Sequence, residues 1–144
     1  VSNVTWLNAD VTKKELYEML LSEYKTADII VSNPPYVTEE EWLQLDVGVK
    51  DFEPKIALFC DENGLKIGKK IVENISSFNL LNEDSIFAME LAEKQPQKIC
   101  PQIGKVIQMN HPIWNSPKNE WFVLCDFEGK DRFLVKICEN ESGV

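Results

Sequence analysis

Residues 27–36 read ADIIVSNPPY, a mostly apolar run that ends in an asparagine, two prolines and a tyrosine. A continuous apolar run is typical of a strand that helices cover on both faces of a parallel sheet. Proline has no N–H to donate to a strand ladder, so we expect the strand to end at Asn33. In open α/β sheets ligands bind beyond the carboxyl ends of the strands. The stretch therefore predicts a buried strand that leads into a functional loop.

Strand and helix patterns alternate along the rest of the chain. Further strands are expected at 4–7, 85–91, 121–126 and 132–138. Helices are expected after a capping-box pattern at Thr12, after Thr38, which could cap a short helix, over 63–78 and within 96–110. Residues that follow the Thr38 helix, to about 59, are expected to form an irregular excursion. This order predicts an α/β fold with a doubly wound, mostly parallel sheet, to which the Glu128–Lys130 turn adds a C-terminal antiparallel hairpin.

Composition and charge narrow the classes of partner. The 144 residues carry a formal net charge of −9, which argues against a nucleic-acid partner, because such binders depend on neutralising phosphates. The cysteines form no C-x-x-C pair, and we assign no role to the one histidine, His111, so no metal site is expected. We expect reduced thiols in an intracellular protein, although four cysteines could form two disulfides. No apolar run reaches the length of a membrane span.

Asn33, Pro34, Pro35 and Tyr36 form the segment with the clearest chemical meaning. An amide nitrogen is a weak nucleophile because its lone pair is delocalised into the carbonyl group. The Asn33 side-chain oxygen and the Pro34 carbonyl can accept its two hydrogens and so direct the lone pair toward an electrophilic carbon. The prolines hold that carbonyl rigidly, and Tyr36 offers a flat face to a planar amide or base. The pattern predicts a catalytic loop, although the same residues also favour a plain turn in front of a buried tyrosine.

Two acidic residues at expected strand ends are further candidates. The Asp10 carboxylate could accept a hydrogen bond from an adenine amino group, with Val11 supplying a backbone or apolar contact. It could equally cap the following helix, since the Thr12 pattern comes directly after it. Glu90 could orient the catalytic loop or pair with a cation. The residues alone do not decide between the two roles of Asp10 or between the two roles of Glu90.

Several stretches resemble the HemK/PrmC family of release-factor glutamine methyltransferases, which are class I methyltransferases. ADIIVSNPPYV is similar to that family's strand and catalytic loop, and DVGVKDFEPKIALFCDENGL to the D-F-E-P stretch that follows it. SIFAMEL takes the place of the next strand, and FEGKDRFLVKI resembles the terminal hairpin with its G-x-x-R turn. The resemblance runs from about Asp10 to Cys138. Asn-Pro-Pro-Tyr alone is shared with adenine-specific and other amino-methyltransferases. The D-F-E-P stretch is what favours the release-factor family over those enzymes.

The resemblance implies methyl transfer from S-adenosylmethionine to the glutamine side-chain amide in the Gly-Gly-Gln loop of a peptide-chain release factor. By matching positions, Asn33, Pro34, Pro35 and Tyr36 are expected to bind that glutamine, and Asn33 also to lie close to the cofactor. Asp10 and Val11 match the adenine contact, and Glu53 is expected to line the substrate cleft. The compartment would be mitochondrial or cytoplasmic, with a preference for mitochondrial.

This chain also departs from the family pattern. Cys60–Glu62 stand where the family commonly has D-G-G, and Ala92-Glu93 replace an expected glycine. No G-x-G-x-G loop occurs, so residues 1–144 are expected to be the C-terminal portion of a catalytic domain, inactive without the glycine-rich cofactor half. An N6-adenine methyltransferase acting on DNA or RNA, and a non-catalytic methyltransferase-like scaffold, remain the alternatives.

Overall fold

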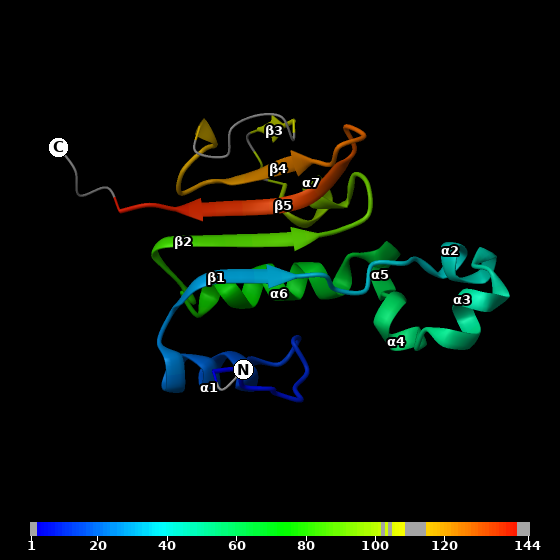
Figure 1. The fold of residues 1–144 in the computed structure, drawn as a ribbon, viewed down its shortest axis with the longest axis horizontal. Helices are drawn as coiled ribbons and strands as arrows, with labels where there is room; N and C mark the ends of the chain where they lie inside the picture. The colour runs from blue at the N-terminus through cyan, green and yellow to red at the C-terminus, as the bar shows by residue number, and fades with distance from the viewer. Residues whose placement is uncertain (1–2, 102, 104, 109–114, 141–144) are drawn as a thin grey trace.

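The computed structural model describes residues 3–101, 103, 105–108 and 115–140, and shows an α/β fold around one mixed five-stranded sheet (Figure 1). The strands are β1 (Ala27–Ser32), β2 (Leu81–Glu90), β3 (Val106–Ile107), β4 (Trp121–Cys125) and β5 (Asp131–Cys138). The helices are α1 (Lys14–Tyr24), α2 (Glu39–Gln44), α3 (Val47–Phe52), α4 (Lys55–Leu58), α5 (Asp61–Gly64), α6 (Lys66–Ser77) and α7 (Gln95–Ile99). The strand order is β1-β2-β5-β4-β3. The α/β class is the one that the sequence predicts, but the sheet is mixed and not mostly parallel, because β5 is antiparallel to both β2 and β4.

The strand register brings three chain segments to one edge of the sheet. β1 and β2 are parallel, with Ser32 beside Met89. β5 is antiparallel to β2, with Phe133 beside Glu90, and it is also antiparallel to β4 on its other side. The carboxyl ends of β1 and β2 therefore meet the amino end of β5. β5 itself lies inside the sheet, with β4 and β3 beyond it.

One face of the sheet carries the main core. Phe87 and Met89 of β2 are fully buried there, together with Ile71 and Ile75 of α6 and Tyr17 of α1. α6 runs along the strands β1 and β2, as Figure 1 shows. Apolar side chains four residues apart lie on the same face of a helix, which explains why α6 packs in this way.

The opposite face of the sheet holds a smaller cluster: Ile107, Phe122, Val135 and Ile137. Beside this cluster β1 is open, and Ile29 and Val31 are 68% and 76% exposed. The expectation that helices cover both faces of β1 is therefore wrong for the described residues. Ile30, on the other side of the strand, packs against the main core instead.

Two expectations near the start of the chain are wrong. Residues 4–7 form no strand, and Trp6 is 91% exposed, because no strand of the described part lies beside them to complete a ladder. The capping box at Thr12 does not form either. α1 begins at Lys14 without a side-chain cap, and Thr12 donates its hydrogen bonds to Asp10. The second capping box does form, at Thr38.

Later elements agree better with the sequence patterns. α6 and β2 confirm the helix over 63–78 and the strand over 85–91, with shifted boundaries. The helix expected within 96–110 is limited to α7, because Pro101 disfavours helical backbone in the residue before it, and β3 follows. His111 lies outside the described residues. Within the part of the chain that is described, no helix is long and apolar enough to span a membrane.

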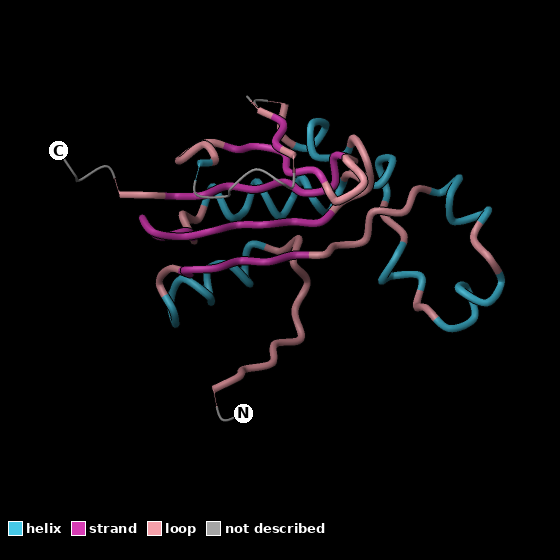
Figure 2. The backbone as a smooth tube through the Cα atoms, turned by 45° about the horizontal axis from the view of Figure 1, so that its top comes forward, coloured by secondary structure: helices cyan, strands magenta, loops and turns pink. Residues whose placement is uncertain are grey.

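Residues 37–59 leave the sheet edge as a closed excursion that contains α2, α3 and α4 (Figure 2). A parallel bridge between Val37 and Phe59 closes it. The Val37 N–H donates to the Leu58 carbonyl at 2.8 Å, and the Cys60 N–H donates to the Val37 carbonyl at 2.9 Å. The excursion therefore starts and ends directly beside Tyr36.

Truncation of a core side chain tests this placement of the main core. Phe87 is fully buried and packs edge-on against Trp121, whereas Phe127 is 93% exposed. We expect Phe87→Ala to lower the free energy of unfolding by about 3–5 kcal/mol through lost burial and a cavity. Phe127→Ala should change it by less than about 0.5 kcal/mol. Urea denaturation measures both, and equal losses would contradict the placement.

Candidate functional site

The Asn33–Tyr36 loop lies at the carboxyl end of β1 (Figure 1). Pro34 is buried, Pro35 and Tyr36 are half-buried, and Asn33 is exposed. The loop lines a hollow of about 160 Å³ together with Val37, Ala57 and Leu58 of the excursion. Asn33 therefore borders open space and not the core, as contact with a substrate would require.

A larger hollow, of about 610 Å³, joins this loop to the segment before α1. Asp10, Val11 and Pro35 all line it, although they are far apart in the sequence. Pro35 lines both hollows, so the loop stands between them. The structure thus brings Asp10 and Val11 together with Pro35 of the predicted catalytic loop, whereas Asn33, also predicted to lie close to the cofactor, lines only the smaller hollow.

A third hollow, of about 300 Å³, lies between α1, β1 and α6. Its lining is almost wholly apolar, with side chains such as Leu20 and Ile71, and it includes no residue of the Asn33–Tyr36 loop. Ligand sites need a few converging polar groups as well as apolar walls. We assign no ligand to this hollow.

Asp10 both holds a turn and lines the larger hollow. Its Oδ1 accepts hydrogen bonds from the Thr12 N–H at 2.8 Å and the Thr12 hydroxyl at 2.7 Å. The Thr12 N–H, and then the Thr12 hydroxyl, lower the pKa of the Asp10 carboxyl, which is therefore ionised at neutral pH. Beside it the Val11 carbonyl accepts a hydrogen bond from the Tyr17 hydroxyl at 2.8 Å, so the core side of α1 positions this segment.

Arg132 links the end of β2 to the catalytic-loop tyrosine. Its Nη2 donates to Glu90 Oε1 at 2.9 Å and to the Tyr36 hydroxyl at 3.4 Å. The guanidinium carbon lies 5.9 Å from the centre of the Tyr36 ring, within the range of a cation–π contact. Glu90 therefore pairs with a cation, and that cation contacts the loop. The ion pair fixes the position from which Arg132 reaches Tyr36.

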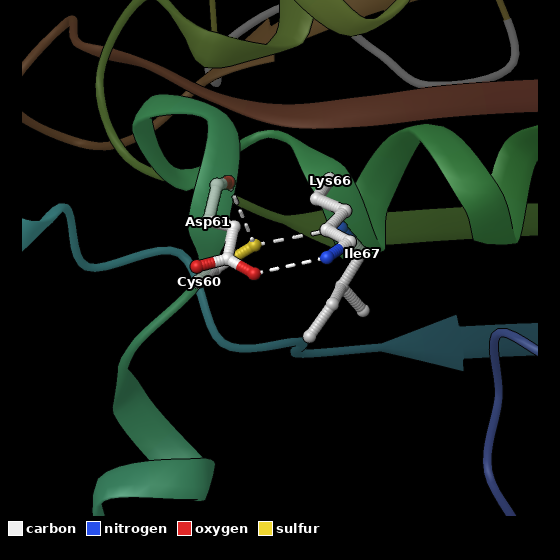
Figure 3. Close-up of polar contacts among 4 residues, drawn as sticks. All are labelled: Cys60, Asp61, Lys66 and Ile67. Carbon is white, nitrogen blue, oxygen red and sulfur yellow. Dashed lines mark hydrogen bonds and ion pairs between the residues drawn. The ribbon is translucent and has the colours of Figure 1, made fainter.

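The turn between the excursion and α6 forms one wall of the larger hollow. Lys66 donates to Asp61 at 2.9 Å, and this hydrogen bond raises the pKa of Lys66 (Figure 3). The Cys60 thiol donates to the Asp61 carbonyl and accepts the Ile67 N–H, each at 3.4 Å, which ties the turn to the first turn of α6 (Figure 3). These contacts place one negative and one positive side chain on the hollow's rim.

The same turn approaches the Asn33–Tyr36 loop through its backbone. Glu62, Asn63 and Gly64 have left-handed φ values of 56°, 55° and 78°. A Cβ atom on Gly64 would lie 2.1 Å from the Tyr36 carbonyl oxygen. Only glycine allows this approach, because any side chain would collide with the backbone of Tyr36.

Some site residues do not match the sequence analysis. Glu53 is exposed at the end of α3 and lines neither hollow of the loop. Arg132 and Gln95 contact the loop and were not predicted as site residues. The G-x-x-R turn was a usable signal for Arg132, whereas Gln95 follows a stretch that departs from the family pattern.

Comparison with known proteins identifies relatives for nearly the whole chain. No family model matches it. The chain is 32% identical to a release factor glutamine methyltransferase of Bacillus anthracis over 142 residues, covering 95% of this chain and 45% of that protein. It is 36% identical to that of Bacillus subtilis, covering 94% of this chain and 44% of the relative. It is 40% identical to that of Streptococcus pneumoniae, covering 75% of this chain and 35% of the relative. The chain thus spans less than half the length of these relatives.

The α/β fold and its loop are consistent with part of a methyltransferase. Over nearly its whole length the chain is similar to part of the release factor glutamine methyltransferases, which confirms the HemK/PrmC resemblance. These relatives are bacterial and give no support to the mitochondrial preference stated above.

A pair of glycine substitutions tests the close approach to Tyr36. Gly64 and Gly129 have nearly the same φ, 78° and 79°, but a Cβ on Gly129 would meet nothing closer than 3.7 Å. Gly129→Ala should therefore cost only the left-handed backbone strain, about 1–2 kcal/mol. Gly64→Ala should reduce the free energy of unfolding by more, because it adds a collision with backbone. Equal losses in urea denaturation would show that the approach is looser than described.

Proposed function

We propose that the protein containing these residues transfers a methyl group from S-adenosylmethionine to the glutamine side-chain amide in the Gly-Gly-Gln loop of a peptide-chain release factor. The observation that carries the proposal is the position of the Asn33–Tyr36 loop between two hollows, with Asn33 exposed. The names of the relatives support the substrate class.

Asn33 and Pro34 orient the amide that is to be methylated. The Asn33 side-chain oxygen accepts one amide hydrogen, and the Pro34 carbonyl accepts the other. When both N–H groups of the amide point at fixed oxygens, the plane of the amide is fixed. The nitrogen lone pair is then perpendicular to that plane. Tyr36 supplies a flat surface that limits rotation of the amide, and Arg132 holds the Tyr36 ring in place. The rate gain then comes from alignment of two reactants and not from a strong base.

The larger hollow is the proposed place of the methyl donor. S-adenosylmethionine supplies an electrophilic sulfonium methyl group when it is bound. The residues fit its adenine end, because the ionised Asp10 carboxylate can accept a hydrogen bond from the amino group of the adenine ring. Val11 and the apolar side chains Phe59 and Ile67 border the same hollow and can cover the ring faces. Because Pro35 lines both hollows, a donor in one lies beside an amide in the other.

The longer protein is proposed to complete the catalytic domain to which these residues belong. Residues 1–144 are proposed to be the C-terminal portion of a catalytic domain with a doubly wound sheet and a terminal hairpin. The share of the Bacillus anthracis protein that the chain matches, 45%, supports the statement that these residues are part of a longer domain. Glu53 is proposed to contact the release factor from the exposed end of α3. The buried Cys60 and Cys125 suit a reducing, intracellular compartment.

Substitution of Asn33 tests the proposal directly. We expect Asn33→Ala in the full-length protein to lower methyl transfer to release factor by about 100-fold or more, because the amide loses one of two orienting contacts. Transfer is measured with methyl-labelled S-adenosylmethionine. Asn115→Ala is the matched control, since Asn115 is also exposed and lies outside the site. Wild-type transfer by Asn33→Ala would reject the mechanism.

Two further incubations separate the alternatives. Label that enters duplex DNA and not release factor would reject glutamine methylation in favour of an adenine methyltransferase. Label in neither would favour a non-catalytic scaffold. We expect residues 1–144 alone to transfer no label under conditions in which the full-length protein does.

A further inference from the structure

We propose that Gln95 is a positioning residue: it fixes the downstream end of the Asn33–Tyr36 loop and thereby the direction of the Pro34 carbonyl. This role rests on the proposed function for its catalytic meaning, but the contact itself is independent of it. Gln95 opens α7 and is only 5% exposed. It lies outside the segments on which the sequence analysis placed the site.

The Gln95 side chain connects three chain segments. Its Nε2 donates to the Tyr36 carbonyl at 3.1 Å and to the Asn63 carbonyl at 3.4 Å. Its Oε1 accepts the Ala92 N–H at 3.1 Å. Backbone carbonyls only accept and a backbone N–H only donates, so these partners allow one orientation of the amide. The loop, the left-handed turn and the segment that follows β2 are thereby tied to a single buried group.

The backbone around Gln95 makes the side chain a firm support. The Gln95 N–H donates to the Ala92 carbonyl at 3.0 Å, and Pro96 directly after it is buried. Gly64 packs so closely that an added Cβ would lie 2.4 Å from Gln95 Nε2. The amide therefore has little room to take another rotamer.

Holding Tyr36 is an effective way to aim the Pro34 carbonyl. The upstream end of the loop is set by Ser32, which lies beside Met89 in the sheet. The two prolines have fixed φ, which leaves few free torsions between Ser32 and Tyr36. When the Tyr36 carbonyl is also held, the remaining torsions are restricted, and with them the direction of the Pro34 oxygen. Loss of Gln95 removes one of the two hydrogen bonds that hold the Tyr36–Val37 peptide, the other being the Val37 N–H bond to the Leu58 carbonyl.

Loss of Gln95 should not release the whole excursion. The Val37 N–H still bonds the Leu58 carbonyl, and the Val37 carbonyl still accepts the Cys60 N–H. Arg132 still contacts the Tyr36 hydroxyl. A variant at position 95 is therefore expected to keep both hollows but to leave the Tyr36 carbonyl without its partner.

Gln95→Leu and Gln97→Leu in the full-length protein form a matched pair. Gln97 lies in the same helix, and its amide donates to Asp131 and not to the Tyr36 carbonyl. We expect Gln95→Leu to lower kcat for release-factor methylation by about 10- to 100-fold, with KM for S-adenosylmethionine within about twofold of wild type. It should also speed hydrogen exchange of the Val37 amide, which bonds the Leu58 carbonyl and shares a peptide plane with the Tyr36 carbonyl. Gln97→Leu should change neither kcat nor that exchange, even where it lowers Tm equally.

Each outcome decides the role of Gln95. Equal kcat and equal loop exchange in the two variants would overturn it, as would a fall in kcat that only follows the folded fraction. If Gln95→Leu does not fold, Gln95→Met replaces it, because methionine keeps the length of the side chain but cannot donate to the Tyr36 carbonyl. If the wild type methylates no release factor, the proposed function fails, and the exchange rates still decide whether Gln95 holds the loop.

Discussion

The parallel pairing of β1 with β2, with Ser32 beside Met89, is the constraint on which the rest of the site depends. It ends both strands at one edge, so that Asn33 and Glu90 leave the sheet close together. β5 then runs back along β2 and delivers Arg132 to the same edge, where it bonds Glu90 and Tyr36. The loop is thus held by strand pairing before it and by side chains from later segments after it.

Local sequence signals predicted the parts of the molecule that local physics decides. The apolar run before Asn33 predicted β1 because two prolines cannot continue a ladder. The spacing of isoleucines predicted α6, and Thr38 predicted the capped start of α2. Asp10 lines the same hollow as Pro35, but the strand expected before Asp10 does not form, so the rule that ligands gather at carboxyl strand ends does not explain its position.

Features that depend on tertiary neighbours were not predictable in the same way. Residues 4–7 have a strand-like pattern but no strand beside them in the described part, and Thr12 bonds Asp10 instead of capping α1. Gln95 contacts Tyr36 across 59 positions of sequence, and no spacing rule predicts such a contact. The open face of β1 likewise depends on what lies beside it and not on its own composition.

The central claim is that two fixed oxygens of the Asn33–Tyr36 loop hold an amide NH₂ group toward the methyl donor. The most direct test is a crystal structure of the full-length protein with S-adenosylhomocysteine and release factor. The account predicts the glutamine amide nitrogen about 3 Å from both the Asn33 side-chain oxygen and the Pro34 carbonyl oxygen. A glutamine bound elsewhere, or an Asn33 side chain turned away from it, would contradict the account.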